Sequence, residues 1–348
     1  LEPSSAASDV YKRQDIDHAG MSNRADQTRY MIKFNFLRTG NPKQPSWNGG
    51  TDSWQAPTET LGRYSHPKVW STMWDWLRGH TQTDVLPPQD IPLHVSQLNS
   101  SDQPRRLEAI YTLGAMGPAA LAPLLESLRS VEGQGRIDPP YVQNEDGSYS
   151  VNAVMEAQRR WTEGGYIFQD EAYALGRLGE VAIDPLRQLL QSKDPWIVIN
   201  AAFALGQIGY LAARAIDDLT VLLDSADHRV VRAILESIAC IGSNTEAALP
   251  AIKKILRTDR ETWHQDTDLP YLVGDQIHFN AALALLSSDL PIMVMEDFLL
   301  ELLERPADRN FVQAIALEVL LRNPSESSLP KVLKYLQVHC WDDTEMSY

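Results

Sequence analysis

A short apolar motif closed by glycine recurs along the C-terminal two-thirds of the chain. The form L-G-x-x-G stands at 113–117, 175–179 and 205–209, and a fourth copy at 238–242 keeps its last glycine. The second and third copies are 30 residues apart, and the third and fourth are 33 apart. A period of this length is typical of repeat proteins, whose units bury their apolar faces against their neighbours.

Helix start and stop signals divide each unit into two helices. Eleven residues before the motif stands an aspartate, a preferred N-cap, in three copies: Asp102, Asp194 and Asp227. Ten residues after the motif begins, proline suits the first turn of a second helix, at Pro123 and Pro185. The last motif position is expected to end the first helix in a left-handed conformation, at Gly117, Gly179, Gly209 and Gly242. Each unit is therefore predicted to be a helix, a tight turn and a second helix.

The spacing of apolar residues predicts which helix faces are buried. Three sets recur at helical spacing: Ala202, Leu205 and Ile208; Leu219, Leu222 and Leu223; and Ile252, Ile255 and Leu256. Two weaker units without the glycine turn follow Asp275 and Asp308, which are again 33 residues apart. We therefore predict a mainly α fold, an α-solenoid of about six helix pairs over residues 101–337, with a C-terminal tail at 338–348.

These units resemble HEAT repeats, in the short form found in phycobilisome-lyase proteins. The resemblance implies a protein-interaction module with a protein partner on the solenoid surface, although a solenoid fold does not fix its ligand. A bilin lyase or phycobiliprotein chaperone is a further alternative. Two insertions interrupt the stack, at about 130–169 and 258–274, and the second contains Trp263 and His264. Such insertions either form a binding rim or are neutral loops.

The first 100 residues follow a different pattern. Residues 28–39 alternate, with Tyr30, Ile32, Phe34 and Phe36 on one side, which predicts a half-buried strand. We assign 15–44 to this β segment and 45–100 to a connector with one short helix. The connector is rich in tryptophan, since five of nine lie between Trp47 and Trp76. Residues 1–14, which begin at Leu1, resemble read-through of an adapter in an assembled environmental sequence, the alternative being a disordered tail.

The N-terminal part of the chain resembles the C-terminal end of a jelly-roll. The resemblance rests on His18, the turn at Gly20–Asn23, the strand that begins near Arg29 and the segment that follows this strand. The similarity is to phytanoyl-CoA dioxygenase-like proteins, which depend on Fe(II) and 2-oxoglutarate. It implies that His18 is the distal iron ligand and that Arg29 pairs with the 2-oxoglutarate carboxylate. Imidazole suits Fe(II), and the guanidinium fork suits a carboxylate.

The family's H-x-D ligand pair has no counterpart before His18. His264-Gln265-Asp266 has this spelling, but it lies downstream in an insertion, and the other histidines show no ligand spacing. We therefore expect a fragment. Fe(II) and 2-oxoglutarate would act in an intact parent enzyme, whereas this chain would bind neither cofactor and would be inactive. The alternative is a non-catalytic scaffold whose N-terminal segment is a docking strand.

Charge and cysteine content narrow the partner classes. The chain has 348 residues and a net charge of −15; residues 1–100 hold ten charges of each sign, so the excess lies in 101–348. An acidic surface disfavours nucleic acid, whose phosphates need basic residues. No apolar run appears long enough to cross a membrane. Cys240 and Cys340 are too few for a disulfide framework, which suits the cytoplasm.

Overall fold

The computed structural model describes residues 42–45, 54–55, 66–80, 86–100, 102–133, 141–143, 149–151, 166, 168–258, 260–264, 272–304, 312–322 and 324–338. The chain divides into two compact units, Leu1–Asn41 and Pro42–Tyr348. The first unit lies entirely outside the described residues. The predicted strand at 28–39, His18 and Arg29 belong to it and stay predictions.

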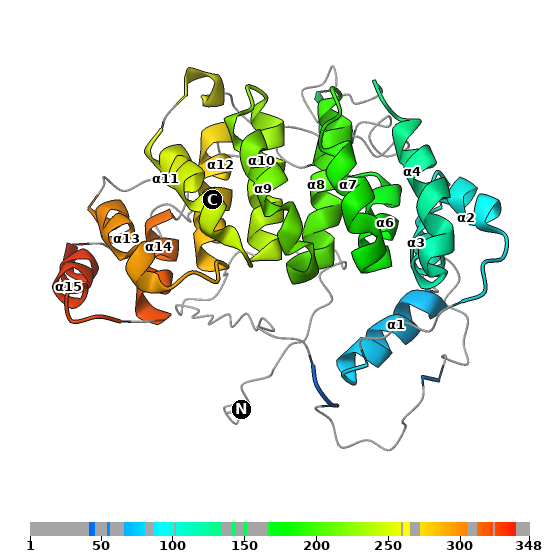
Figure 1. The fold of residues 1–348 in the computed structure, drawn as a ribbon, viewed down its shortest axis with the longest axis horizontal. Helices are drawn as coiled ribbons and strands as arrows, with labels where there is room; N and C mark the ends of the chain where they lie inside the picture. The colour runs from blue at the N-terminus through cyan, green and yellow to red at the C-terminus, as the bar shows by residue number, and fades with distance from the viewer. Residues whose placement is uncertain are drawn as a thin grey trace, which may run out of the picture. The chain divides into compact units, whose positions relative to one another are not determined.

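The described residues of the second unit form a series of helix pairs (Figure 1). The predicted number of six pairs is confirmed. The pairs are α3 (Gln103–Ala115) with α4 (Leu121–Arg129), α6 (Asp170–Leu178) with α7 (Ile183–Leu189), α8 (Pro195–Ile208) with α9 (Ile216–Val221), α10 (His228–Ile241) with α11 (Leu249–Arg257), α12 (Val273–Leu286) with α13 (Glu296–Leu303), and α14 (Val312–Arg322) with α15 (Leu329–Val338).

The first helices of successive pairs pack side by side. Helix α3 contacts α6, α6 contacts α8, and the series continues through α10 and α12 to α14. We call these six helices the first-helix row. Several second helices pack against the first helix of the next pair, as α4 does on α6, α7 on α8 and α11 on α12. Because each pair covers the apolar face of its neighbour, the core runs continuously through the series.

The predicted glycine turns are present. Gly117, Gly179, Gly209 and Gly242 have φ of 62°, 67°, 72° and 63°, a region that favours glycine. Short 3-10 helices lead from the turns into the second helices: η2 (Gly117–Ala120), η3 (Gly179–Ala182), η4 (Gly209–Ala215) and η6 (Thr245–Ala248). Pro123 and Pro185 lie in the first turns of α4 and α7, as expected.

The aspartate caps are confirmed at two of three positions. Asp194 Oδ1 accepts a hydrogen bond from the Trp196 amide at 2.7 Å, and Asp227 Oδ1 accepts one from Arg229 at 3.0 Å. Asp102 occupies the N-cap position without such a bond, because its carboxylate pairs with Arg105 Nε at 3.3 Å. Asp275 is not an N-cap but the third helical residue, where it accepts the Leu272 amide at 2.8 Å.

The predicted core positions are largely buried. Leu205, Leu219 and Ala202 are inaccessible to solvent, and Ile252, Ile255 and Leu256 are nearly so. Ile208 and Leu222, by contrast, are half-buried, because each lies at the end of its helix beside a turn. The weaker C-terminal units bury the same kinds of residue, including Ala281, Leu285 and Ala316.

Several elements differ from the sequence prediction. The connector holds two described helices, α1 (Pro67–Leu77) and α2 (Ile91–Gln97), and the sequence analysis missed the second, which is short and lacks a side-chain cap. The first insertion contains an antiparallel pair, β1 (Tyr141–Gln143) and β2 (Tyr149–Val151). In the second insertion, Trp263 of η7 (Glu261–Trp263) is a core residue instead of a rim residue. The remaining 3-10 helices are η5 (Leu222–Asp224) and η8 (Ile292–Val294).

One helical stretch does have the length and composition of a membrane span, contrary to our expectation. Residues Pro195–Asp224 have a mean hydropathy of 1.5 over an 18-residue window, of which 61% is buried. The apolar residues face neighbouring helices, because α8 packs between α6 and α10. The chain also turns within this stretch, since Gly209 has φ 72° and ψ −145°. The stretch therefore consists of two core helices and the turn between them.

A buried ion pair joins the first two repeats across the long insertion. Arg106 Nε of α3 lies 3.2 Å from Asp170 Oδ2 at the start of α6, with side chains 12% and 3% exposed. Next to it, the Ser127 hydroxyl of α4 donates to Glu171 at 2.7 Å. Two buried charges need each other, because neither can be solvated by water. The pair therefore fixes α3 against α6, although the insertion of about forty residues lies between α4 and α6 in the sequence.

We predict that Leu205→Ala lowers the free energy of unfolding by about 2–5 kcal/mol, because it empties a fully buried site. Val221→Ala is the control, since Val221 is 76% exposed, and its expected effect is within about 0.5 kcal/mol. Denaturant unfolding followed by circular dichroism measures both. An unchanged midpoint for Leu205→Ala would contradict the core assignment.

We also predict that Arg106→Ala costs about 3–5 kcal/mol, because it leaves Asp170 charged and buried. Arg105→Ala is the matched control: Arg105 is one residue away, 71% exposed, and paired with Asp102, so its removal should cost at most about 1 kcal/mol. Equal losses of stability in the two variants would show that the Arg106–Asp170 pair has no special role.

Candidate binding site on the first-helix row

Glycine at the second motif position brings consecutive first helices into close contact. A Cβ atom placed on Gly114 would lie 2.8 Å from the Cβ of Arg177, and one on Gly176 would lie 2.7 Å from the Cβ of Gln207. On Gly206 it would lie 3.2 Å from the backbone of Ser237. Each glycine therefore leaves room for a residue of the next first helix, within or just before that helix's motif. The sequence analysis explained the last glycine of the motif and missed this role of the second.

Two residues before each motif, the side chain is half-buried on the surface of the row. This position holds Tyr111 in α3, Tyr173 in α6, Phe203 in α8 and Glu236 in α10. The Tyr173 and Phe203 rings touch, with centroids 4.7 Å apart and planes at 70°. The Arg177 guanidinium lies 4.0 Å from the Tyr111 ring centroid. We call Tyr111, Tyr173 and Phe203 the aromatic track, and Glu236 follows it in the next repeat.

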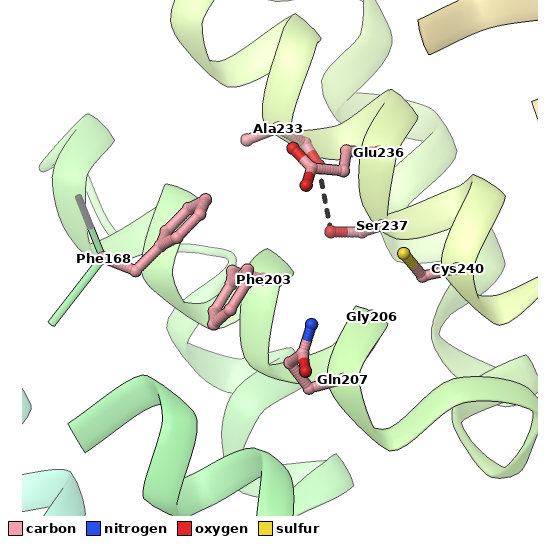
Figure 2. A pocket seen from close by; sticks show the side chains of 8 residues that line it. All are labelled: Phe168, Phe203, Gly206, Gln207, Ala233, Glu236, Ser237 and Cys240. Atoms are coloured by element: carbon pink, nitrogen blue, oxygen red, sulfur yellow. Dashed lines mark hydrogen bonds between the residues drawn. The ribbon is translucent and has the colours of Figure 1, made fainter. Parts of the chain in front are cut away.

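A shallow hollow lies between α8 and α10 where the track ends (Figure 2), and its empty space of about 210 Å³ includes open solvent. Helix α8 contributes Phe203 and Gln207, and α10 contributes Glu236, Ser237 and Cys240. Phe168, from the segment before α6, completes the wall. Figure 2 shows the two phenyl rings on one side of the hollow and the α10 side chains on the other.

A buried asparagine holds Phe168 in place. The Asn200 side-chain oxygen accepts the Gln169 amide at 2.8 Å, and its nitrogen donates to the Trp196 carbonyl at 2.9 Å. Asn200 is inaccessible to solvent; its bond to Trp196 is buried, and its bond from Gln169 is partly buried. The adjacent Phe168 ring then stacks on Phe203, with centroids 3.8 Å apart and planes at 11°. Tyr166 meets Phe168 edge to face at 6.4 Å.

The opposite wall is polar. The Ser237 hydroxyl lies 2.6 Å from the Ala202 carbonyl oxygen and 2.9 Å from that of Ala233, so its single proton stays within the helix contact. Burial raises the pKa of the Glu236 carboxyl, and the charge of Arg232 offsets part of this rise. Burial, and secondarily the charge of Glu236, raises the pKa of the Cys240 thiol. The thiol is therefore mainly protonated at neutral pH and a weak nucleophile.

These groups suit binding more than catalysis. The hollow contains a carboxyl, an amide, a hydroxyl and a neutral thiol, but it has no histidine or lysine beside the thiol to activate it. Across the described part of the chain, no three His, Cys, Asp or Glu side chains gather as a metal site would require.

The residues that the sequence singled out for iron chemistry are not brought together here. His18 and Arg29 lie outside the described residues, as does Asp266 of the H-x-D sequence. His264 lies at the end of η7 on the surface. His278 has a structural role, with Nε2 3.0 Å from the Thr258 carbonyl oxygen and its ring against Trp263. The aromatic track could have been found from the sequence, because Y-T-L-G, Y-A-L-G and F-A-L-G share one register.

Comparisons with known proteins agree with the repeat assignment. The family model for HEAT repeats matches residues 172–239, which span the second helix pair of the described series to most of α10. A search among curated proteins found no match.

Solved structures include distant matches. One is a designed armadillo repeat protein in complex with the peptide (KR)4, at 19% identity over 72% of this chain and 99% of that chain, with a TM-score of 0.31. Another is the complex of CpcE and CpcF of phycocyanin lyase from Nostoc sp. PCC7120, at 20% identity over 74% and 97%, with a TM-score of 0.32. Scores this low carry no argument about ligands, so the lyase alternative stays a prediction. The six helix pairs show a repeat solenoid, and the family model identifies HEAT repeats in residues 172–239.

Proposed function

We propose that this chain is a protein-interaction module that binds an extended segment of a partner protein along the first-helix row. The aromatic track is the observation that carries this proposal. Half-buried Tyr111, Tyr173 and Phe203 present ring surface at the same position of three successive repeats. Aromatic side chains supply much of the binding energy at protein interfaces, because they bury a large area with few rotatable bonds.

The regular spacing favours an extended segment over a compact ligand. Each repeat offers one side chain at the same register, so a partner lying along the row meets similar surfaces at intervals. The hollow is also open to solvent and far smaller than the 300–1,000 Å³ of common small-molecule pockets. A partner side chain would therefore lie over the hollow, against its walls, as one contact within a longer interface.

Selection from a random peptide display library against the full chain tests this proposal. We expect selected peptides to bind Phe203→Ala at least about tenfold more weakly, which corresponds to about 1.4 kcal/mol. Val221→Ala should bind the same peptides with an affinity within about twofold of the unmodified chain, because Val221 is exposed on the second helix α9, away from the row. Gln207→Lys, at an exposed position in the hollow, is a second row variant that leaves the core intact.

Circular dichroism first establishes that the variants are folded. Peptides that bind the parent and both row variants equally would contradict the proposed surface, as would the absence of any enriched peptide.

We further propose that the chain is the C-terminal part of an Fe(II)- and 2-oxoglutarate-dependent oxygenase related to phytanoyl-CoA dioxygenase. The support is the sequence pattern around His18 and Arg29, followed by the alternating strand at 28–39. The solenoid would then serve to bring the enzyme to a partner protein. The catalytic iron would need two more ligands than His18, and none gather in the described residues.

Iron titration by calorimetry, with an assay for succinate release, tests this second proposal. We expect neither tight Fe(II) binding nor turnover in this chain, because a single imidazole does not hold Fe(II) against water. Extension of the reading frame upstream should reveal an H-x-D sequence, and the extended protein should bind Fe(II) through His18. An extended protein without that sequence would leave the non-catalytic scaffold as the better description.

A further inference from the structure

We infer that the hollow between α8 and α10 binds an arginine side chain of the partner segment. This inference deepens the proposed interaction function and rests on it, since it assigns the chemistry of one anchor on the first-helix row. It follows from an aromatic wall, a carboxylate opposite it and the charge of the chain, taken in turn below.

The aromatic wall suits a flat cation. Phe168 and Phe203 are stacked at 3.8 Å, and Asn200 holds the segment that carries Phe168. A guanidinium is planar and weakly hydrated, so it packs on aromatic surface at little cost in lost water contacts. The same chain already uses this contact elsewhere, since Arg177 lies over Tyr111 at 4.0 Å and Arg232 over Tyr166 at 4.4 Å.

The facing carboxylate supplies the charge complement. Glu236 is half-buried on α10, and Figure 2 shows its carboxylate pointing across the hollow toward the phenyl rings. It takes the position that the aromatic track occupies in the preceding repeats. A guanidinium next to it would form charge-assisted hydrogen bonds, which are stronger than neutral ones in a partly desolvated site.

Other side-chain classes fit the hollow less well. An acidic side chain would face Glu236 and an acidic solenoid, because the net charge of −15 lies in residues 101–348. An apolar side chain would remove water from the carboxylate and replace it with nothing. Arg232 is the cation nearest in sequence, one helical turn before Glu236, but its guanidinium is stacked on Tyr166.

The protonation state of the Glu236 carboxyl makes the binding of a cation dependent on pH. Because burial raises its pKa, Glu236 takes up a proton at a higher pH than an ordinary glutamate, and protonation removes its attraction for a guanidinium. The Cys240 thiol has a raised pKa, so it stays uncharged as the pH falls from 7 to 5. We therefore expect the affinity to decrease over this range, with a proton released on binding at its lower end.

The test uses N-acetyl-arginine methylamide and its neutral isostere N-acetyl-citrulline methylamide. The full chain, labelled at alanine methyl groups, is titrated with each probe by NMR, and the Ala233 methyl group in the wall of the hollow is followed. We expect saturable shifts with arginine and at least tenfold weaker binding of citrulline. Glu236→Gln should lower arginine affinity at least tenfold and remove the dependence on pH.

Glu126→Gln is the matched control, because Glu126 is an exposed carboxylate on the second helix α4 and the change of charge is the same. Its affinity for the arginine probe should be within about twofold of that of the unmodified chain. Glu236→Gln removes a charge that burial disfavours, so its thermal midpoint at pH 7 should be no lower than that of the parent. Gln207→Lys, which places an ammonium in the hollow, should also reduce arginine binding.

Equal binding of arginine and citrulline, or an unchanged affinity in Glu236→Gln, would overturn the assignment of arginine. Peptides from the display selection separate this failure from that of the interaction function. If they bind through Phe203 and tolerate replacement of every arginine by citrulline, the row is a binding surface with a different anchor. If no peptide binds the row, the proposed function itself fails.

Discussion

The close approach of consecutive first helices is the contact on which the rest of the solenoid depends. Gly114, Gly176 and Gly206 each leave room for a residue of the next helix, to within 2.7–3.2 Å of where a Cβ would lie. At this separation, apolar side chains on both sides of the row become inaccessible, and the cores of successive pairs merge. The same contact determines which residues reach the surface. The positions two before each motif stay half-buried along the row, because the neighbouring helix covers one side of each.

The repeats could be predicted well from the sequence, because the residues that begin and end the helices of each repeat lie within that repeat. Glycines of positive φ, prolines in first turns and apolar residues at helical spacing depend on local physics, and all recur. Predictions that depended on which side chains come into contact were less successful. Asp102 and Asp275 resemble Asp194 and Asp227 in sequence, yet their carboxylates are engaged differently, by Arg105 in one case and by the Leu272 amide in the other. Trp263 lies in an insertion and still packs in the core, against His278 and under Arg260.

The candidate site was hidden for a related reason. Its members come from three places in the sequence: the end of an insertion, the middle of α8 and the middle of α10. Phe168 meets Phe203 because Asn200 bonds to Gln169, a contact across 31 residues that no local pattern reveals. What the sequence did contain was the shared register of Tyr111, Tyr173 and Phe203, which becomes meaningful once the first helices are known to lie side by side. His18 and Arg29, by contrast, rest on resemblance alone.

The change from phenylalanine to glutamate between neighbouring repeats shows how a repeat protein acquires specificity. The fold uses Phe203 and Glu236 alike, as half-buried residues beside a buried core, so their replacement affects stability less than that of Leu205 would. Burial nevertheless makes the charge of Glu236 costly, as the raised pKa of its carboxyl indicates. Asn200 accepts a hydrogen bond from the Gln169 amide, and Asp194 accepts one from the Trp196 amide. Within the hollow, no such hydrogen bond offsets the cost of burying Glu236. A residue that the fold tolerates but does not satisfy is a reasonable position for a ligand, because a partner can supply the missing charge.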